Sequence, residues 1–96
     1  PRRPAARTDG TRWEDSEYVE RAPDGQMQVI VYSYHWENAE GELLLRWDNT
    51  PHFPGLPGFP HHVHDGDTGI TRAGRPMDVF TVLNTIQQRI TRGKET

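Results

Sequence analysis

Residues 26–37, QMQVIVYSYHWE, constrain the fold more than any other segment, because they combine β-branched and aromatic side chains and contain neither Gly nor Pro. This composition predicts a long β-strand. Successive side chains of a strand point to opposite faces. One face would be apolar and aromatic and the other would change from apolar to polar, with Ile30, Tyr32, Tyr34 and Trp36 on the first and Met27, Val29, Val31, Ser33 and His35 on the second. The chain therefore needs a sheet with one buried face.

A second strand is predicted at residues 42–48, ELLLRWD, after a loop at 38–41 that ends in Gly. Pairing of Glu37 with Glu42 would make the apolar face continuous, by placing Trp36 opposite Leu43, Tyr34 opposite Leu45 and Tyr32 opposite Trp47. A slip of one residue would bring Arg46 and Asp48 among the aromatic side chains, where an unpaired charge is costly to desolvate. The opposite face would then carry Ser33, His35, Arg46 and Asp48.

Two shorter segments complete a predicted antiparallel sheet of about four strands. Residues 16–22, SEYVERA, form the first strand, with Tyr18 and Val19 as candidates for inward-facing side chains. Residues 61–64, HHVH, form the last strand. Residues typical of turns follow both segments: Pro23-Asp24-Gly25 follows the first strand, and Asp65-Gly66-Asp67 follows the last.

Between the second and the last strand, residues 49–60, NTPHFPGLPGFP, contain four prolines and two glycines. Proline has no backbone N–H to give to a sheet, so this segment cannot be a central strand. We expect it to cross the domain in stiff, extended stretches that hold side chains in fixed positions.

A C-terminal helix is predicted to begin around residues 73–76, with Pro76 in its first turn, and to end at Gly93. Its apolar side chains recur at helical spacing, which indicates one stripe that packs on the apolar face of the sheet: Met77, Phe80, Leu83, Ile86 or Gln87, and Ile90. The expected fold class is therefore α+β, with a small antiparallel sheet and one helix.

The 96 residues suffice for one hydrophobic core, and the apolar residues concentrate in 27–47 and 77–90 despite a mean hydropathy of −0.89. We predict a single domain at 12–92, a flexible basic arm at 1–11 and a tail at 93–96. No apolar run approaches the roughly 20 residues that cross a bilayer, and no signal-peptide core follows the first residues. A cytoplasmic protein is expected.

Several chemistries are excluded or disfavoured by the residue types present. The chain has no cysteine, which excludes disulfides, thiolate metal sites and a cysteine nucleophile. The formal net charge of −3 gives no global attraction to nucleic acid. Ser33 is not on a sharp nucleophile elbow, and Gly55-Leu56-Pro57-Gly58 lacks the helix and Lys-Ser/Thr pair of a phosphate-binding loop.

Three motifs in this order resemble the TumE family of toxin–antitoxin proteins: Tyr32-Ser33-Tyr34-His35-Trp36, then Arg46-Trp47-Asp48-Asn49-Thr50-Pro51-His52, then Phe59-Pro60-His61-His62-Val63-His64. The similarity covers roughly residues 16–90. Three positions differ from the usual family residues, since Trp47 replaces a tyrosine, Phe53 a second histidine and Val63 a lysine. The resemblance implies a toxin encoded beside a small helix-turn-helix antitoxin.

The leading hypothesis for the chemistry is metal-independent cleavage of RNA. Such cleavage needs a base for the 2′-hydroxyl, an acid for the leaving 5′ oxygen and a cation for the developing negative charge. Histidine suits both proton roles near neutral pH, and the planar guanidinium of Arg46 can hold a phosphate. His62 and His64 are the leading proton-transfer pair, with His35 or His52 as reserves. Asp48 would orient a histidine or pair with Arg46.

Three alternatives remain open. A zinc-type metal site would use His62 and His64, which point to the same side of a strand, together with His52, Asp65 or Asp67, whereas His61 would face away. A protein that only binds would contact nucleic acid through the arginines and Trp13, Trp36 and Trp47, or a partner through an exposed aromatic patch. A purely structural role would pair Arg46 with Asp48 and bond the histidines to backbone. Homo-oligomers are also left open.

Overall fold

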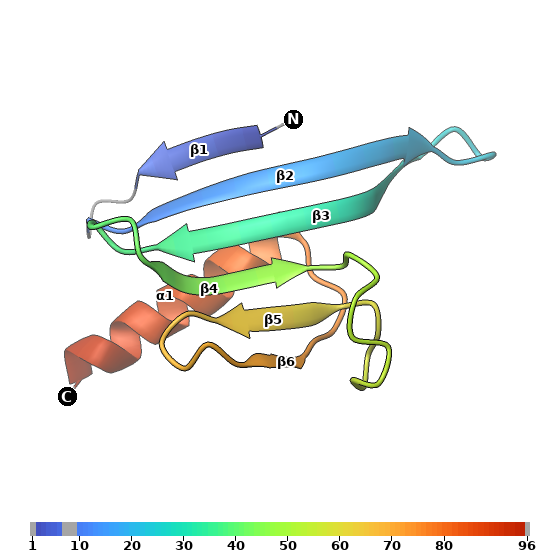
Figure 1. Ribbon diagram of the computed structural model, residues 1–96. Helices are drawn as coiled ribbons and strands as arrows, with labels where there is room; N and C mark the ends of the chain where they lie inside the picture. The colour runs from blue at the N-terminus through green and yellow to red at the C-terminus, as the bar shows by residue number, and fades with distance from the viewer. Residues whose placement is uncertain (1, 7–9, 96) are drawn as a thin grey trace.

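The computed structural model of the chain describes residues 2–6 and 10–95. It contains a six-stranded antiparallel sheet in which the strands follow one another in sequence order, and one C-terminal helix that lies across one face (Figure 1). The elements are β1 (Arg2–Ala6), β2 (Arg12–Arg21), β3 (Met27–Glu37), β4 (Leu43–Asp48), β5 (His62–Asp65), β6 (Thr71–Ala73) and α1 (Val79–Glu95). The α+β class is confirmed, but the sheet has six strands rather than about four.

The two additional strands lie at the edges of the sheet. β1 belongs to the stretch expected to be a flexible arm, and it pairs with the first half of β2 from Arg12 to Ser16. β6 follows the turn at 65–69, which Asp65 stabilises by accepting the backbone N–H groups of Asp67 and Thr68. A strand as short as β6 carries too few residues to show an alternating pattern, which is why sequence periodicity missed it.

The pairing of β3 with β4 differs from the predicted register by two residues. Tyr34 lies opposite Trp47, and Trp36 lies opposite Leu45, with an irregularity before Glu37. The connecting loop sets this register, because the Asn38 side chain accepts the backbone N–H groups of both residue 40 and residue 42. A shift of two residues keeps every side chain on the same face. The predicted partners are therefore wrong, whereas the predicted faces are confirmed for residues 32–36 and 45–48. Ile30, expected on the apolar face, is 40% exposed, and Leu44 rather than Leu43 packs against the core.

The hydrophobic core lies between the aromatic face of the sheet and α1. Its buried members are Tyr32, Tyr34, Trp36, Leu45, Trp47, Val82 and Ile86. The helix begins later than expected, because the Asp78 carboxylate caps it by accepting the backbone N–H of Thr81, and it continues through Gly93. Its stripe is also rotated: Val79, Val82, Ile86 and Ile90 face the core, and Phe80 is 79% exposed.

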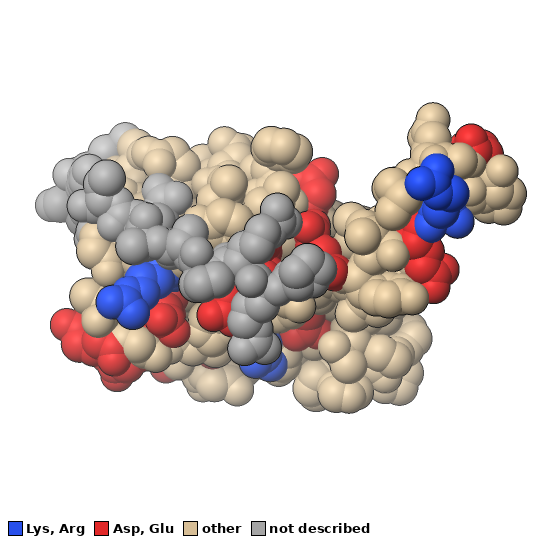
Figure 2. All heavy atoms as spheres, turned by 90° about the horizontal axis from the view of Figure 1, so that it is seen from above, with Lys and Arg blue, Asp and Glu red and all other residues tan. Residues whose placement is uncertain are grey.

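The β2–β3 hairpin extends beyond the part of the sheet that α1 covers (Figure 1), and its tip stands out from the body in the space-filling view (Figure 2). Tyr18 and Val19, expected to face inward, are 57% and 41% exposed because they lie on this extension. Closer to the body, Glu17 accepts a hydrogen bond of 2.7 Å from the Tyr34 hydroxyl, and burial together with this carboxylate raises the pKa of Tyr34. Within the described residues, no helix is long and apolar enough to cross a membrane.

The orientation of α1 can be tested with two large-to-small substitutions. Ile86→Ala removes a side chain with 0% exposure and should lower the free energy of unfolding by about 2–5 kcal/mol. Phe80→Ala is the matched control on the same helix, and it should change stability by no more than about 0.5 kcal/mol. Urea unfolding followed by circular dichroism measures both values. Equal losses for the two variants would contradict the helix orientation described here.

Candidate functional site

The face of the sheet that α1 leaves uncovered carries polar side chains from three adjacent strands. Two rows of directly paired residues cross β3, β4 and β5: His35, Arg46 and His64 form one row, and Ser33, Asp48 and His62 form the next. Neighbouring pairs in an antiparallel sheet bring side chains within contact distance on a common face. The proline-rich segment 49–60 makes this possible, because it returns the chain so that β5 lies antiparallel beside β4.

Asp48 is the centre of this face. Its carboxylate is only 7% exposed and contacts three side chains. His62 Nε2 lies 2.8 Å from Oδ1, His64 Nε2 lies 3.4 Å from Oδ2, and Arg46 Nε lies 3.4 Å from Oδ2. Oδ1 also accepts the backbone N–H of Thr50. The carboxylate therefore joins both leading histidines and the candidate phosphate-binding cation in one cluster.

Each imidazole of this cluster is oriented by a partner at its other nitrogen. His62 Nδ1 lies 3.0 Å from the carbonyl oxygen of Pro60, and His64 Nδ1 lies 3.1 Å from Oγ1 of Thr71 on β6. The two rings are nearly perpendicular, at 83°, with centroids 4.8 Å apart. They differ in access to solvent, since the side chain of His62 is 2% exposed and that of His64 is 22% exposed. Only His64 of this pair can meet a substrate without rearrangement.

Phe53 covers the two histidines from the proline-rich segment. Its ring makes T-shaped contacts with both, at centroid distances of 5.3 Å from His62 and 6.2 Å from His64. Its backbone adopts φ 59°, the left-handed region that residues with a side chain rarely enter. In the sequence, Phe53 stands out only as a departure from the family pattern, because a positive φ at a phenylalanine leaves no sequence signal. The contact shields one side of the cluster from water.

The other predicted site residues are not in the cluster. His35 lies on the same face, 3.2 Å from Glu37, and His52 is exposed on the loop and touches Phe53 edge-on. His61 lies on the opposite side, as expected, where its Nδ1 is 2.7 Å from the Tyr32 hydroxyl. Asp65 also lies on the helix side, opposite Leu45, and pairs with Arg72. It therefore cannot join the expected metal ligands. The carboxylate that lies near His62 and His64 is that of Asp48. The backbone N–H of Asp67 is bonded within its turn.

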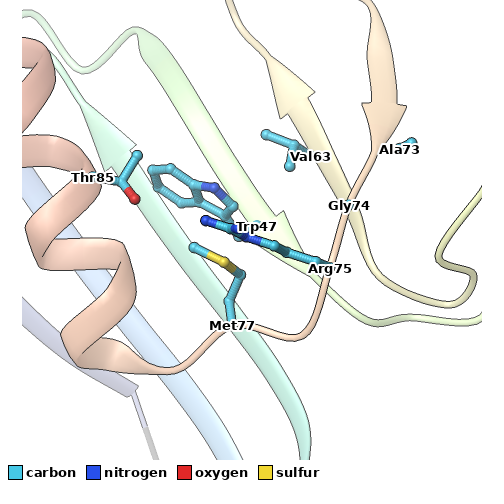
Figure 3. A pocket seen from close by; sticks show the side chains of 7 residues that line it. All are labelled: Trp47, Val63, Ala73, Gly74, Arg75, Met77 and Thr85. Atoms are coloured by element: carbon cyan, nitrogen blue, oxygen red, sulfur yellow. The ribbon is translucent and has the colours of Figure 1, made fainter.

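A separate hollow lies on the helix side of the sheet. It has a volume of about 330 Å³ and is lined by Trp47, Val63, Met77, Thr85 and the segment 73–75. Figure 3 shows the Arg75 side chain extending beside the indole of Trp47, with Met77 next to it. Trp47 points away from Arg46 and Asp48, its neighbours in β4, so this hollow and the histidine cluster are on different faces.

The surroundings of His64 oppose its protonation. Burial lowers the pKa of His64 from its ordinary value of 6.5, and the Arg46 guanidinium lowers it further, while the Asp48 carboxylate acts in the opposite direction. The neutral ring is therefore favoured in the folded protein at neutral pH. Because the unfolded chain binds this proton more readily, the stability that the shift contributes is present above pH 6.5 and is lost as pH falls through that value towards the folded pKa.

An NMR pH titration in EDTA checks this shift. The C–H resonances of the His64 ring should give a pKa below 6.5, and Arg46→Gln should raise it, because the substitution removes a positive charge beside the ring. Arg72→Gln is the control substitution, because Arg72 pairs with Asp65 on the helix side, and it should leave the His64 pKa unchanged. A fall in the His64 pKa on Arg46→Gln would contradict the arrangement.

Comparison with known proteins identifies the relationship of the chain. The family model described as Toxin TumE matches residues 2–93. No curated protein and no solved structure matches the chain.

Proposed function

The chain belongs to the TumE toxin family, and we propose that it is the toxin component of a toxin–antitoxin system that cleaves RNA on the polar face of its sheet. The observation that supports this most is the contact of one buried carboxylate, Asp48, with His62, His64 and Arg46. A titratable cluster beside a cation, on a face left open by the fold and with the pKa of one member, His64, lowered by burial, is typical of a reaction centre.

Cleavage of RNA through its own 2′-hydroxyl needs few protein groups. A base accepts the hydroxyl proton, an acid gives a proton to the 5′ oxygen that leaves, and a cation stabilises the negative charge on phosphorus-bound oxygens. Arg46 suits the last task because its side chain is 39% exposed and carries a fixed positive charge. His35 lies directly across from Arg46, so a phosphate held by the guanidinium is near a second titratable ring.

The assignment of His62 and His64 as an acid and base pair stays a prediction, and the geometry supports unequal roles. His64 is the member of the pair that a substrate can approach. His62 is buried, with one nitrogen beside the Pro60 carbonyl and the other beside Asp48, which supports a positioning role. Asp48 in turn holds His64 and Arg46 together on the same face.

A binding protein without catalysis is less well supported. Trp36 and Trp47 are 5% and 4% exposed in the core, so they cannot stack on bases. Trp13 packs against the same core. The formal net charge of −3 does not favour general nucleic-acid binding either.

Purified protein incubated with labelled RNA tests the proposal. We expect cleavage of RNA and none of DNA of the same sequence, because only RNA has the 2′-hydroxyl nucleophile. Arg46→Gln should lower the rate by about 10²–10³-fold, the range found when one stabilising donor of a transition state is removed. Reactions in EDTA and with added Zn²⁺ show whether cleavage needs a metal ion. Cleavage in either condition supports RNA as the substrate.

Arg72→Gln is the matched control, because Arg72 is an exposed arginine on β6 that pairs with Asp65 away from the cluster. It should retain the wild-type rate. RNA that stays intact at a large excess of wild-type protein, in both metal conditions, would refute cleavage. A toxin that still arrests growth after Ala substitution of His62 and His64, but not after Arg46→Ala, would act by binding instead.

We propose that the partner is a small helix-turn-helix antitoxin, as the family resemblance implies. The gene beside this one should encode such a protein, and its deletion should be lethal only when this chain is intact. A viable deletion strain that produces intact toxin would count against this partner.

A further inference from the structure

The cluster contains three potential metal ligands that converge. One oxygen of Asp48 and one nitrogen each of His62 and His64 all lie within 4.8 Å of one another. Donor atoms bound to one zinc ion at about 2.0–2.2 Å lie roughly 3.3 Å apart. The two oxygens of Asp48 each approach one ring, with Oδ1 2.8 Å from His62 Nε2 and Oδ2 3.4 Å from His64 Nε2, so either oxygen lies beside the donor nitrogens. Small side-chain rotations would place all three around one ion.

The hydrogen bonding of His62 supports a ligand independently of this spacing. The carbonyl oxygen of Pro60 can only accept, so the hydrogen of the neutral His62 ring is on Nδ1 and Nε2 carries a lone pair. That lone pair faces Asp48 Oδ1, which is also an acceptor, at 2.8 Å. Two acceptors at this distance repel each other unless a positive species lies between them.

A proton on His62 Nε2 does not resolve this contact well. Although the distance is short, the geometry is not aligned for a hydrogen bond, and Nε2 is a fully buried polar atom without a hydrogen-bond partner among the described residues. Such an atom is expensive to leave unsatisfied. A cation located beside the carboxylate, along the lone-pair direction, would satisfy both groups.

From these contacts we propose that Asp48, His62 and His64 form a binding site for one divalent cation of the zinc class. Two imidazoles and one carboxylate suit a borderline ion such as Zn²⁺ and disfavour Mg²⁺, which prefers oxygen ligands. The Nδ1 contacts to Pro60 and to Thr71 Oγ1 are the outer partners that metal-bound histidines usually have. Three protein ligands leave a coordination position for water or substrate.

A cation here changes the roles of the cluster without depending on RNA cleavage. Both imidazoles become ligands rather than proton-transfer groups, and His35, whose Nε2 lies 3.2 Å from Glu37, is a titratable ring on this face outside the ligand set. Arg46 lies next to the site, and its positive charge would repel the ion in the absence of an anion. A phosphate would relieve that repulsion, because it can contact the guanidinium and the cation together.

Metal titration of the whole chain, prepared without an affinity tag or a nickel column and stripped with EDTA, tests the site. Co²⁺ is added while its visible absorption is recorded, followed by competition with Zn²⁺ and with Mg²⁺. We expect one ion per chain, displacement by Zn²⁺ and none by Mg²⁺. Metal should also raise the Tm, because it binds only the folded state.

Metal affinity is compared between the wild type and variants of partly exposed residues, because His62 is buried and its removal threatens folding. His64→Ala should weaken binding by at least about 100-fold, and Thr71→Val, which removes the outer partner of His64, by about 10–100-fold. The matched controls are His52→Ala and His35→Gln, histidines near the cluster that should keep wild-type affinity. Circular dichroism verifies that each variant is folded.

The inference is overturned if the stripped wild-type chain binds no Zn²⁺, if a folded His64→Ala chain binds as tightly as wild type, or if His52→Ala abolishes binding. The outcome is separable from that of the proposed function. A chain that binds zinc and leaves RNA intact supports the metal site and contradicts RNA cleavage. A chain that binds no zinc and cleaves RNA in EDTA supports RNA cleavage and contradicts the metal site.

Discussion

Burial of the aromatic face of β3 and β4 beneath α1 is the constraint on which the rest of the structure depends. Tyr34 and Ile86 are completely buried at this contact. Because side chains alternate along a strand, directing one set of residues into the core directs the other set to the open face. The position of His35, Arg46 and Asp48 is thus a consequence of packing on the other side of the sheet.

The functional face is completed by β5, which supplies the imidazoles to the carboxylate of β4. Asp48 has little exposure and touches two imidazole rings and the guanidinium of Arg46. The surrounding groups, the Pro60 carbonyl, the Thr71 hydroxyl and the ring of Phe53, fix the orientation of these rings. A site held in this way is preorganised, which is the property that both proton transfer and cation binding require.

Sequence reasoning succeeded where a local repeat was strong and failed where a distant contact decided the outcome. The faces of β3 and β4 followed from alternation. The pairing of these strands did not, because the Asn38 loop shifts it by two residues, a change that alternation cannot detect. Apolar spacing predicts the helix but not its orientation, because Asp78 caps it later than Pro76 suggests and Phe80 then faces solvent.

The same division applies to the candidate site. Local periodicity and residue type were enough to place Arg46 and Asp48 on a polar face and to put His62 and His64 on one side of a short strand, because both are properties of a few consecutive residues. Which carboxylate meets those histidines depended on how residues 49–60 bring β5 back against β4, a long-range arrangement that favours Asp48 over Asp65. The closeness of the charged groups is therefore a product of strand pairing, which no short stretch of sequence encodes alone.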